Sequence, residues 1–229
     1  MKIIGLIGGT TWVSTQEYYR IINETIKEKL GKSHSAHLIL YSIDFEKTVI
    51  KNEGKWDIIS KNFIDIAIKL EHSGADFIVI CANTMHKIAD EIQKNINIPI
   101  LHIVDVTAEK IKSTGLKKVG LLGTKYTMKE EFYKKRLKEK FGIETIIPDS
   151  DEIDFVNSVI HEELTNKIIN MSSKQRYIEI INKLISKGAE GIILGCTEIP
   201  LLINQNDIDV PVFDTTEIHA KAAVEYALN

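Results

Sequence analysis

The sequence repeats itself, and this duplication constrains the fold more than any other feature. Two near-continuous apolar runs, "KIIGLIGG" (2–9) and "KKVGLLGT" (117–124), are typical of parallel strands buried on both faces. A second pair, "GADFIVICANTMHK" (74–87) and "GAEGIILGCTEIP" (188–200), reads as buried strands that run into polar loops. Each half predicts four strands alternating with four helices. We therefore expect an α/β fold with two pseudo-symmetric, flavodoxin-like halves, each built on a parallel sheet.

The first helix of each half is expected to begin at a capping box. Ser14 and Glu17 have the required spacing in the first half, as do Thr127 and Glu130 in the second. The two halves therefore share a helix-start signal as well as the pattern of strands.

Composition excludes several classes of function. A formal net charge of -3 and the lack of a long basic run disfavour nucleic acid as a partner. No apolar run approaches the roughly 18 residues of a membrane span, and the first residues lack the pattern of a signal peptide, so we expect a cytoplasmic protein without membrane contact. The 2 cysteines have no metal-site or disulfide-framework spacing. A dinucleotide fingerprint is also absent, which disfavours a nicotinamide enzyme.

The candidate site lies at the carboxyl ends of the strands, where open parallel sheets bind ligands. If the two similar halves face each other, their strand ends and following loops line one active-site cleft. Two readings of Asn83 and Thr84 stay open, ligand binding and capping of the following helix, because both uses place polar side chains at the same helix end. Lys51 is a candidate partner for a substrate carboxylate, although solvated surface lysines are commoner. The polar candidates for substrate binding are Thr10, Lys51, Asn83, Thr84, Thr124, Thr127, Thr197 and Glu198.

Cys196 is the candidate catalytic residue. It stands between a predicted strand and a segment with Pro200 in its first turn, so its sulfur is expected near a helix N-terminus, which lowers a thiol pKa. A buried cysteine acting as a small core residue is the alternative. The flanking Gly195, Thr197 and Glu198 favour the functional reading, because a core would place apolar residues there.

Cys81 is one residue out of step with Cys196. Counting from Gly74 and Gly188, the equivalent of Cys196 is Ala82, and Cys81 pairs with Gly195. Successive side chains of a strand point to opposite faces, so Cys81 is expected in the core unless a bulge turns it toward the site. His86 and His34 have no partner at ligand spacing and are read as ordinary helix and loop residues.

Motifs along nearly the whole chain resemble the aspartate/glutamate racemase family, most closely its bacterial broad-specificity amino acid racemase branch. They include "GLIGGTTWVSTQEYYR", "ANTMHK", "HIVDVT", "LLGTKYTM", "HEEL", "GCTEIPLL" and "PVFDTTEIHA". The resemblance implies a pyridoxal-phosphate-independent isomerase without a cofactor or metal, commonly a homodimer, in which two cysteines exchange the proton at Cα. The position of the first family thiol is Ala82 here, and Cys196 takes the second. The motifs add Met85 and Glu163 as substrate-binding positions.

The resemblance also implies that C-terminal elements return to the first half. We therefore expect a first domain of residues 1–103 plus 210–229 and a second of 104–209.

Three functions stay open at this point. The first is an amino acid racemase, with aspartate or glutamate as substrate, in which Cys196 serves one face of Cα and water the other. The second is a single-cysteine decarboxylase or isomerase of the same superfamily. The third is a catalytically impaired amino acid binding protein. Broad specificity is open too, because the only arginines, at positions 20, 136 and 176, fall in predicted helices.

Overall fold

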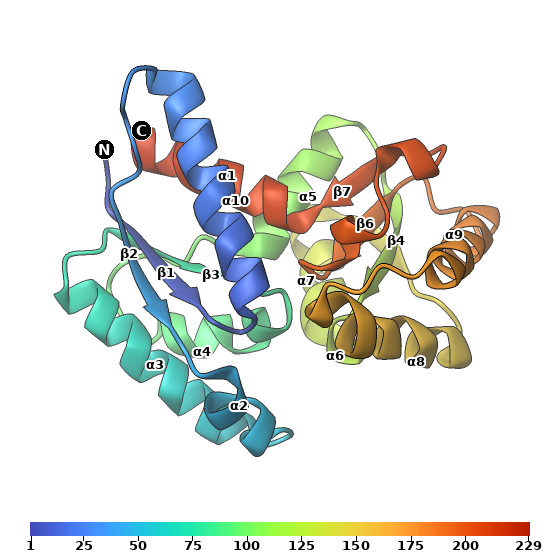
Figure 1. The fold of residues 1–229 in the computed structure, drawn as a ribbon, viewed down its shortest axis with the longest axis horizontal. Coiled ribbons are helices and arrows are strands. Elements are labelled where there is room, and N and C mark those ends of the chain that lie inside the picture. Colours follow the sequence, from blue (N-terminus) through green and yellow to red (C-terminus); the bar gives the residue numbers. More distant parts are fainter. The chain divides into compact units, whose positions relative to one another are not determined.

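The computed structural model describes all 229 residues and contains two parallel β-sheets with helices around them (Figure 1). This confirms the α/β fold with two parallel sheets. The first sheet has the strand order β2-β1-β3, with β1 (Ile4–Gly8), β2 (Leu38–Ser42) and β3 (Phe77–Ile80). The second has the order β5-β4-β6-β7, with β4 (Lys118–Gly123), β5 (Glu144–Ile146), β6 (Ile192–Gly195) and β7 (Val212–Asp214).

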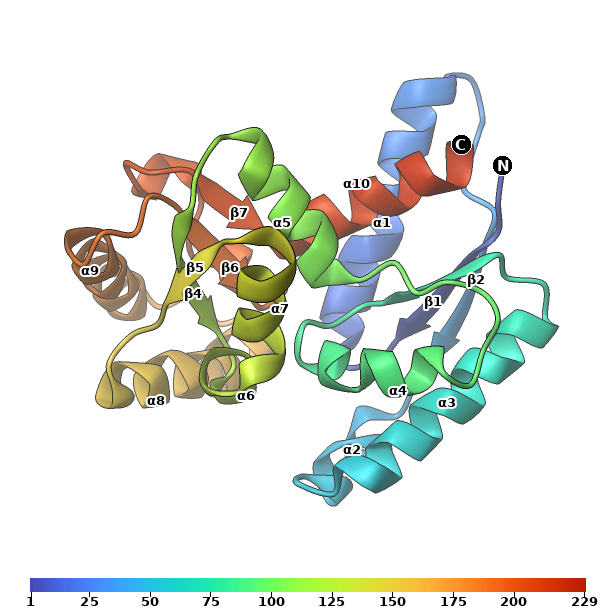
Figure 2. The same ribbon diagram turned by 180° about the vertical axis from the view of Figure 1, so that it is seen from behind.

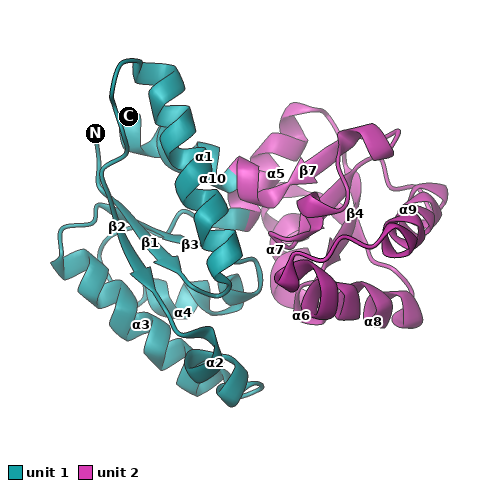
Figure 3. Ribbon diagram, in the orientation of Figure 1, with its two compact units in different colours: residues 1–103, 219–229 teal, residues 104–218 magenta.

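The chain divides into two compact units, shown in Figure 3. Unit 1 comprises residues 1–103 and 219–229, and unit 2 comprises residues 104–218. Residues 210–218, which the sequence placed with the first domain, lie in unit 2 because β7 pairs in parallel with β6. The cleft expected between the halves stays a prediction.

Helices cover both faces of the unit 1 sheet (Figure 2), and each face has its own hydrophobic core. One core contains residues of α3 (Trp56–His72) and α4 (Ala89–Gln93), and the other contains residues of α1 (Trp12–Leu30) and α10 (Thr215–Leu228). The short α2 (Phe45–Thr48) follows β2. The expected fourth strand is reduced to one bridge between Ile78 and Ile100, because the chain enters α5 (Ile103–Ser113) three residues later.

Unit 2 contains the four remaining α-helices, and all of them except α7 contribute residues to one large hydrophobic core against β4 and β6. These are α6 (Lys125–Lys129), α7 (Glu131–Phe141), α8 (Ser150–Ser158) and α9 (Met171–Ser186). No helix of the structure combines the length and the apolar character needed to cross a membrane.

Both first helices begin earlier than the sequence predicted. The cap of α1 is Thr11, whose hydroxyl accepts from the Ser14 amide at 3.1 Å. The cap of α6 is Thr124, whose hydroxyl accepts from the Thr127 amide at 3.3 Å. The expected capping boxes are wrong because these threonines already satisfy the first amides, which leaves the Ser14 hydroxyl available for another contact.

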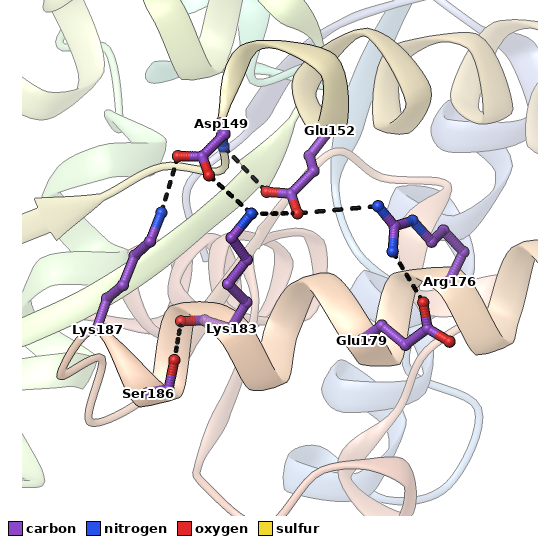
Figure 4. A network of polar contacts seen from close by, with 7 residues as sticks. All are labelled: Asp149, Glu152, Arg176, Glu179, Lys183, Ser186 and Lys187. Carbon is purple, nitrogen blue, oxygen red and sulfur yellow. Dashed lines mark hydrogen bonds and ion pairs between the residues drawn. The ribbon is translucent and has the colours of Figure 1, made fainter.

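Charged side chains attach α8 to α9 (Figure 4). A true capping box of Asp149 and Glu152 opens α8. Lys183 of α9 contacts Asp149 at 2.7 Å and Glu152 at 2.8 Å, and Lys187 contacts Asp149 at 2.8 Å. This network fixes the two helices that flank the segment carrying Glu163.

Candidate functional site

Cys196 lies directly after β6, next to a buried carboxylate. Its Sγ donates to Glu198 Oε2 at 3.0 Å, and Thr197 Oγ1 donates to the same oxygen at 2.6 Å. The backbone approaches closely here because residue 195 is glycine: a Cβ atom there would lie 2.8 Å from the Leu122 carbonyl oxygen. The side chains of Cys196 and Thr197 therefore converge on one carboxylate oxygen of Glu198.

The expected lowering of the Cys196 pKa is wrong. Burial raises the pKa of this thiol well above its ordinary value, and the charge of Glu198 raises it further, whereas the amides of Thr197 and Glu198 lower it. The helix invoked from the sequence is only a 3₁₀ turn, Ile199–Leu201, which supplies little dipole. Cys196 is therefore a protonated thiol at rest, with its proton directed at a carboxylate.

Glu163 lies in the same unit, at the end of a π-helical turn (Val159–Glu163) that follows α8. Its Oε1 accepts from Ser173 Oγ at 2.9 Å, and its Oε2 is buried without a hydrogen-bond partner. Tyr177 donates its hydroxyl to the Val156 carbonyl at 3.0 Å, and its pKa is raised by burial and then by the charges of Cys196 and Glu163. Tyr177 thus lies within electrostatic range of both residues.

Cys81 and Ala82 lie at the end of β3 and face opposite sides of the sheet. Cys81 is fully buried in the core that α1 and α10 cover, where burial raises its thiol pKa. Ala82 is half-buried and packs against the core that α3 covers. No bulge turns Cys81 toward the side of Ala82.

Side chains hold the backbone of the loop after β3. The Cys81 carbonyl accepts from Ser14 Oγ at 2.8 Å and from Thr10 Oγ1 at 3.4 Å. The Ala82 carbonyl lies 2.8 Å from His86 Nδ1. Asn83 is buried and stands at the N-cap position of the following 3₁₀ turn, Thr84–Ile88, but its side chain makes no capping hydrogen bond.

The remaining candidates are more scattered. Met85 packs in the core of unit 1, and its neighbour Thr84 is half-buried. Thr127 is fully buried, with its hydroxyl 3.2 Å from that of Thr124, and Lys51 is exposed on a 3₁₀ turn. No cluster of three or more His, Cys, Asp or Glu side chains is arranged to hold a metal ion.

Sequence reasoning did not name Ser173, which donates to Glu163, or Tyr177. It named Ser14 as a helix cap without predicting its contact with the Cys81 carbonyl. His86 lies in a 3₁₀ turn, Thr84–Ile88, as its reading as a helix residue predicted, and it is buried with a contact to the Ala82 carbonyl that the sequence did not predict. The four-residue step from Ala82 to His86, one helical turn, was the available signal.

Comparisons with known proteins identify a family to which the chain is similar. The model of the Asp/Glu/hydantoin racemase family matches residues 7–223. The broad specificity amino-acid racemase RacX of Bacillus subtilis is 29% identical over 97% of this chain and 96% of its own length. Two solved structures cover 100% of both chains: a putative Asp/Glu racemase from Yersinia pestis (52% identical, TM-score 0.94) and an aspartate racemase homologue from Pyrococcus horikoshii (43% identical, TM-score 0.89). The chain therefore belongs to the Asp/Glu/hydantoin racemase family and is an isomerase.

Proposed function

We propose that this protein is a cofactor-independent amino acid racemase in which Cys196 exchanges the α-proton of its substrate. The observation that carries the proposal is the thiol of Cys196 donating to the buried Glu198 carboxylate at 3.0 Å, in a chain of a racemase family. Aspartate is the first candidate substrate, followed by glutamate and a broader range of amino acids. Similarity to the aspartate racemase homologue of Pyrococcus horikoshii supports aspartate, and similarity to the broad specificity amino-acid racemase of Bacillus subtilis supports a broader range.

The contact between Cys196 and Glu198 explains how a thiol with a raised pKa acts as a base. Moving the Cys196 proton to Glu198 turns thiol and carboxylate into thiolate and carboxylic acid, so the net charge of the pair does not change. A second buried negative charge, which would be costly, never forms. The thiolate then takes the α-proton and returns to the thiol, and the negative charge passes to the substrate. Glu198 keeps its proton until solvent has reprotonated Cα, and then releases it to solvent.

In this proposal, no side chain carries out the second proton transfer, on the face of Cα opposite Cys196. Ala82 occupies the position of the first family thiol and can neither donate nor accept a proton. Solvent then supplies the proton that completes inversion. The enantiomer whose α-hydrogen meets Cys196 should exchange that hydrogen quickly, while inversion lags.

The substrate-binding groups of this proposal are those predicted from the sequence. Backbone amides of the two loops would receive the substrate carboxylate and the charge that develops on it. Lys51 is the proposed partner for an acidic side chain. The proposed set is Thr10, Lys51, Asn83, Thr84, Thr124, Thr127, Glu163, Thr197 and Glu198, with Met85 contributing its backbone.

The test is α-proton exchange in deuterated buffer, followed by NMR with L- and D-aspartate and then L- and D-glutamate, and by chiral analysis of the products. Cys196→Ala should abolish exchange. Cys81→Ala is the matched control, because it removes the other buried thiol and should leave exchange unchanged. Equal exchange and inversion of both enantiomers would refute the single-thiol mechanism, and exchange that survives Cys196→Ala would refute the role of Cys196.

The absence of an acid or base at Ala82 also favours a second candidate, a reaction that needs one proton donor. A decarboxylase of the same superfamily would protonate an enediolate through Cys196 alone. Carbon dioxide release from a substituted malonate, without amino acid exchange, would decide for it. Binding of aspartate with neither reaction would point to the impaired binding protein. A homodimer and a cytoplasmic location are further proposals that rest on the family resemblance and the sequence.

A further inference from the structure

A buried polar cluster of unit 1 connects the loop after β3 to the segment that enters α5. Its members are Tyr18, His86, His102 and His219, each at most 7% exposed. We propose that His86 is a positioning residue of the candidate site, whose ring holds the Ala82 carbonyl and thereby sets the course of the backbone into Asn83 and Thr84. This inference rests on the proposed function, because it gives the loop a role in that reaction.

The contacts of His86 define its tautomer. Nδ1 lies 2.8 Å from the Ala82 carbonyl oxygen, which can only accept, so Nδ1 carries the proton. Nε2 lies 3.2 Å from the Ile103 amide, which can only donate, so Nε2 is the acceptor. Both ring nitrogens of a neutral His86 are thus committed to backbone groups. A protonated ring would direct an N–H group at the Ile103 amide and lose that hydrogen bond.

His219 holds the same segment with the opposite tautomer. Its Nε2 donates to the Leu101 carbonyl at 2.8 Å, and its Nδ1 accepts from the Tyr18 hydroxyl at 2.8 Å. The His86 ring lies edge-on to His219, at 5.5 Å between centroids, and to His102, at 4.7 Å. The rings of His86 and His219 therefore both form hydrogen bonds with the backbone of residues 101–103. This segment gives His86 a fixed support from which to hold Ala82.

The loop depends on this support because the sheet has already ended. β3 stops at Ile80, and the next two carbonyls bond to side chains: that of Cys81 to Ser14 and Thr10, and that of Ala82 to His86. Two consecutive peptide planes are fixed in this way immediately before Asn83. A displacement of about 1 Å at a reacting site costs roughly 100-fold in rate, so a loosened Ala82 carbonyl should reduce turnover more than binding.

Two substitutions separate the contacts of His86. Asparagine places its amide nitrogen near the position of Nδ1, so His86→Asn keeps a donor for Ala82. Glutamine reaches the position of Nε2, so His86→Gln keeps an acceptor for Ile103 and loses the contact with Ala82. We expect kcat for α-proton exchange to fall about 10- to 100-fold in His86→Gln with a smaller change in KM, and to stay within about threefold of wild type in His86→Asn.

Tyr18→Phe is the matched control for stability. It removes the hydroxyl that donates to His219 and leaves both His86 contacts in place. We expect its melting temperature to fall as in the His86 variants, while its exchange rate falls by much less than that of His86→Gln, because both backbone contacts of His86 remain. Equal losses of kcat in His86→Asn and His86→Gln, or a loss in neither, would overturn the positioning role.

Hydrogen–deuterium exchange of the backbone gives a readout that does not need activity. Peptides covering residues 81–86 should exchange faster in His86→Gln than in wild type, and His86→Asn should match wild type. Unchanged protection in His86→Gln would overturn the proposal. If wild type acts on no amino acid while this pattern of protection holds, the proposed function fails and the positioning of the loop stands.

Discussion

Glu198 is the residue on which the chemistry of Cys196 depends. We predict that Glu198→Gln lowers α-proton exchange by about 10²- to 10⁴-fold, the usual contribution of a general base, because the glutamine cannot take the thiol proton. The pKa of Cys196 should change together with the activity. It should fall, because the charge of Glu198 is one of the causes that raise it, and burial should still hold it above the ordinary value. Thiolate absorbance measured against pH, together with the NMR exchange assay, tests both directions, and unchanged exchange would contradict the prediction.

A substitution of Ala82 is expected to give a gain of function. We predict that Ala82→Cys raises the rate of inversion about 10-fold or more relative to α-proton exchange, because a second thiol then replaces solvent as the proton source. The side chain at position 82 points away from the core that holds Cys81, so the new thiol does not compete with that packing. Chiral chromatography of timed reactions measures inversion, and Ala82→Val is the control for added volume. Inversion that still lags in Ala82→Cys would show that position 82 does not serve the substrate.

Single residues differ in how much of their role the sequence predicts. The opposite orientation of Cys81 and Ala82 was predictable, because the alternation of side chains along a strand is fixed by backbone geometry. The pKa of Cys196 was not, because it depends on burial and on the rotamer that brings the Glu198 carboxylate to the sulfur. The contacts of His86 with Ala82 and Ile103 were missed for the same reason, because they exist only after the loop has folded back.

At the scale of elements, the attachment of α9 to α8 depends mainly on Lys183. We predict that Lys183→Met lowers the melting temperature by about 2–4 °C and that Lys187→Met lowers it less. Lys183 contacts both Asp149 and the buried Glu152, whereas Lys187 contacts only Asp149. Without Lys183, the nearest cation to Glu152 is Arg176, at 3.9 Å. Calorimetry of the two variants tests this ranking, and equal shifts would contradict it.

Elements were predictable where apolar periodicity decides them and less so where polar side chains compete. The runs at β1, β4, β3 and β6 predicted buried parallel strands, and the sheet orders bear this out. The helix starts were misplaced because several hydroxyls in "TTWVST" and "GTKYT" could act as caps, and only the folded turn selects Thr11 and Thr124. The place of β7 was misjudged because sequence similarity between the halves does not say which strand an added segment pairs with.

At the scale of the whole molecule, the two units should lose stability in different pH ranges. In unit 1, burial lowers the pKa of His219 to about 4 from an ordinary value of 6.5. The unfolded chain therefore binds a proton that the folded one does not, and stability is complete above about pH 6.5 and falls as the pH approaches 4. The loss is on the order of 3–4 kcal/mol, since a tenfold change in proton affinity is worth about 1.4 kcal/mol.

In unit 2, hydrogen bonds from Lys183 and Lys187 lower the pKa of Asp149 to about 2 from an ordinary 3.8. The stabilisation by this carboxylate is present above about pH 4 and falls as the pH drops toward 2. Acid should thus weaken unit 1 first, through His219, and unit 2 only at lower pH.

The chain supplies its own probe for this order, because both of its tryptophans, Trp12 and Trp56, lie in unit 1. During acid titration, tryptophan fluorescence should change at a higher pH than far-ultraviolet circular dichroism, which reports helices of both units. His219→Gln, which keeps a donor for the Leu101 carbonyl but does not titrate, should shift the fluorescence change to lower pH and leave the later part of the dichroism change in place. Coincident transitions in wild type, or a fluorescence midpoint that His219→Gln does not move, would mean that His219 does not set the acid limit of unit 1.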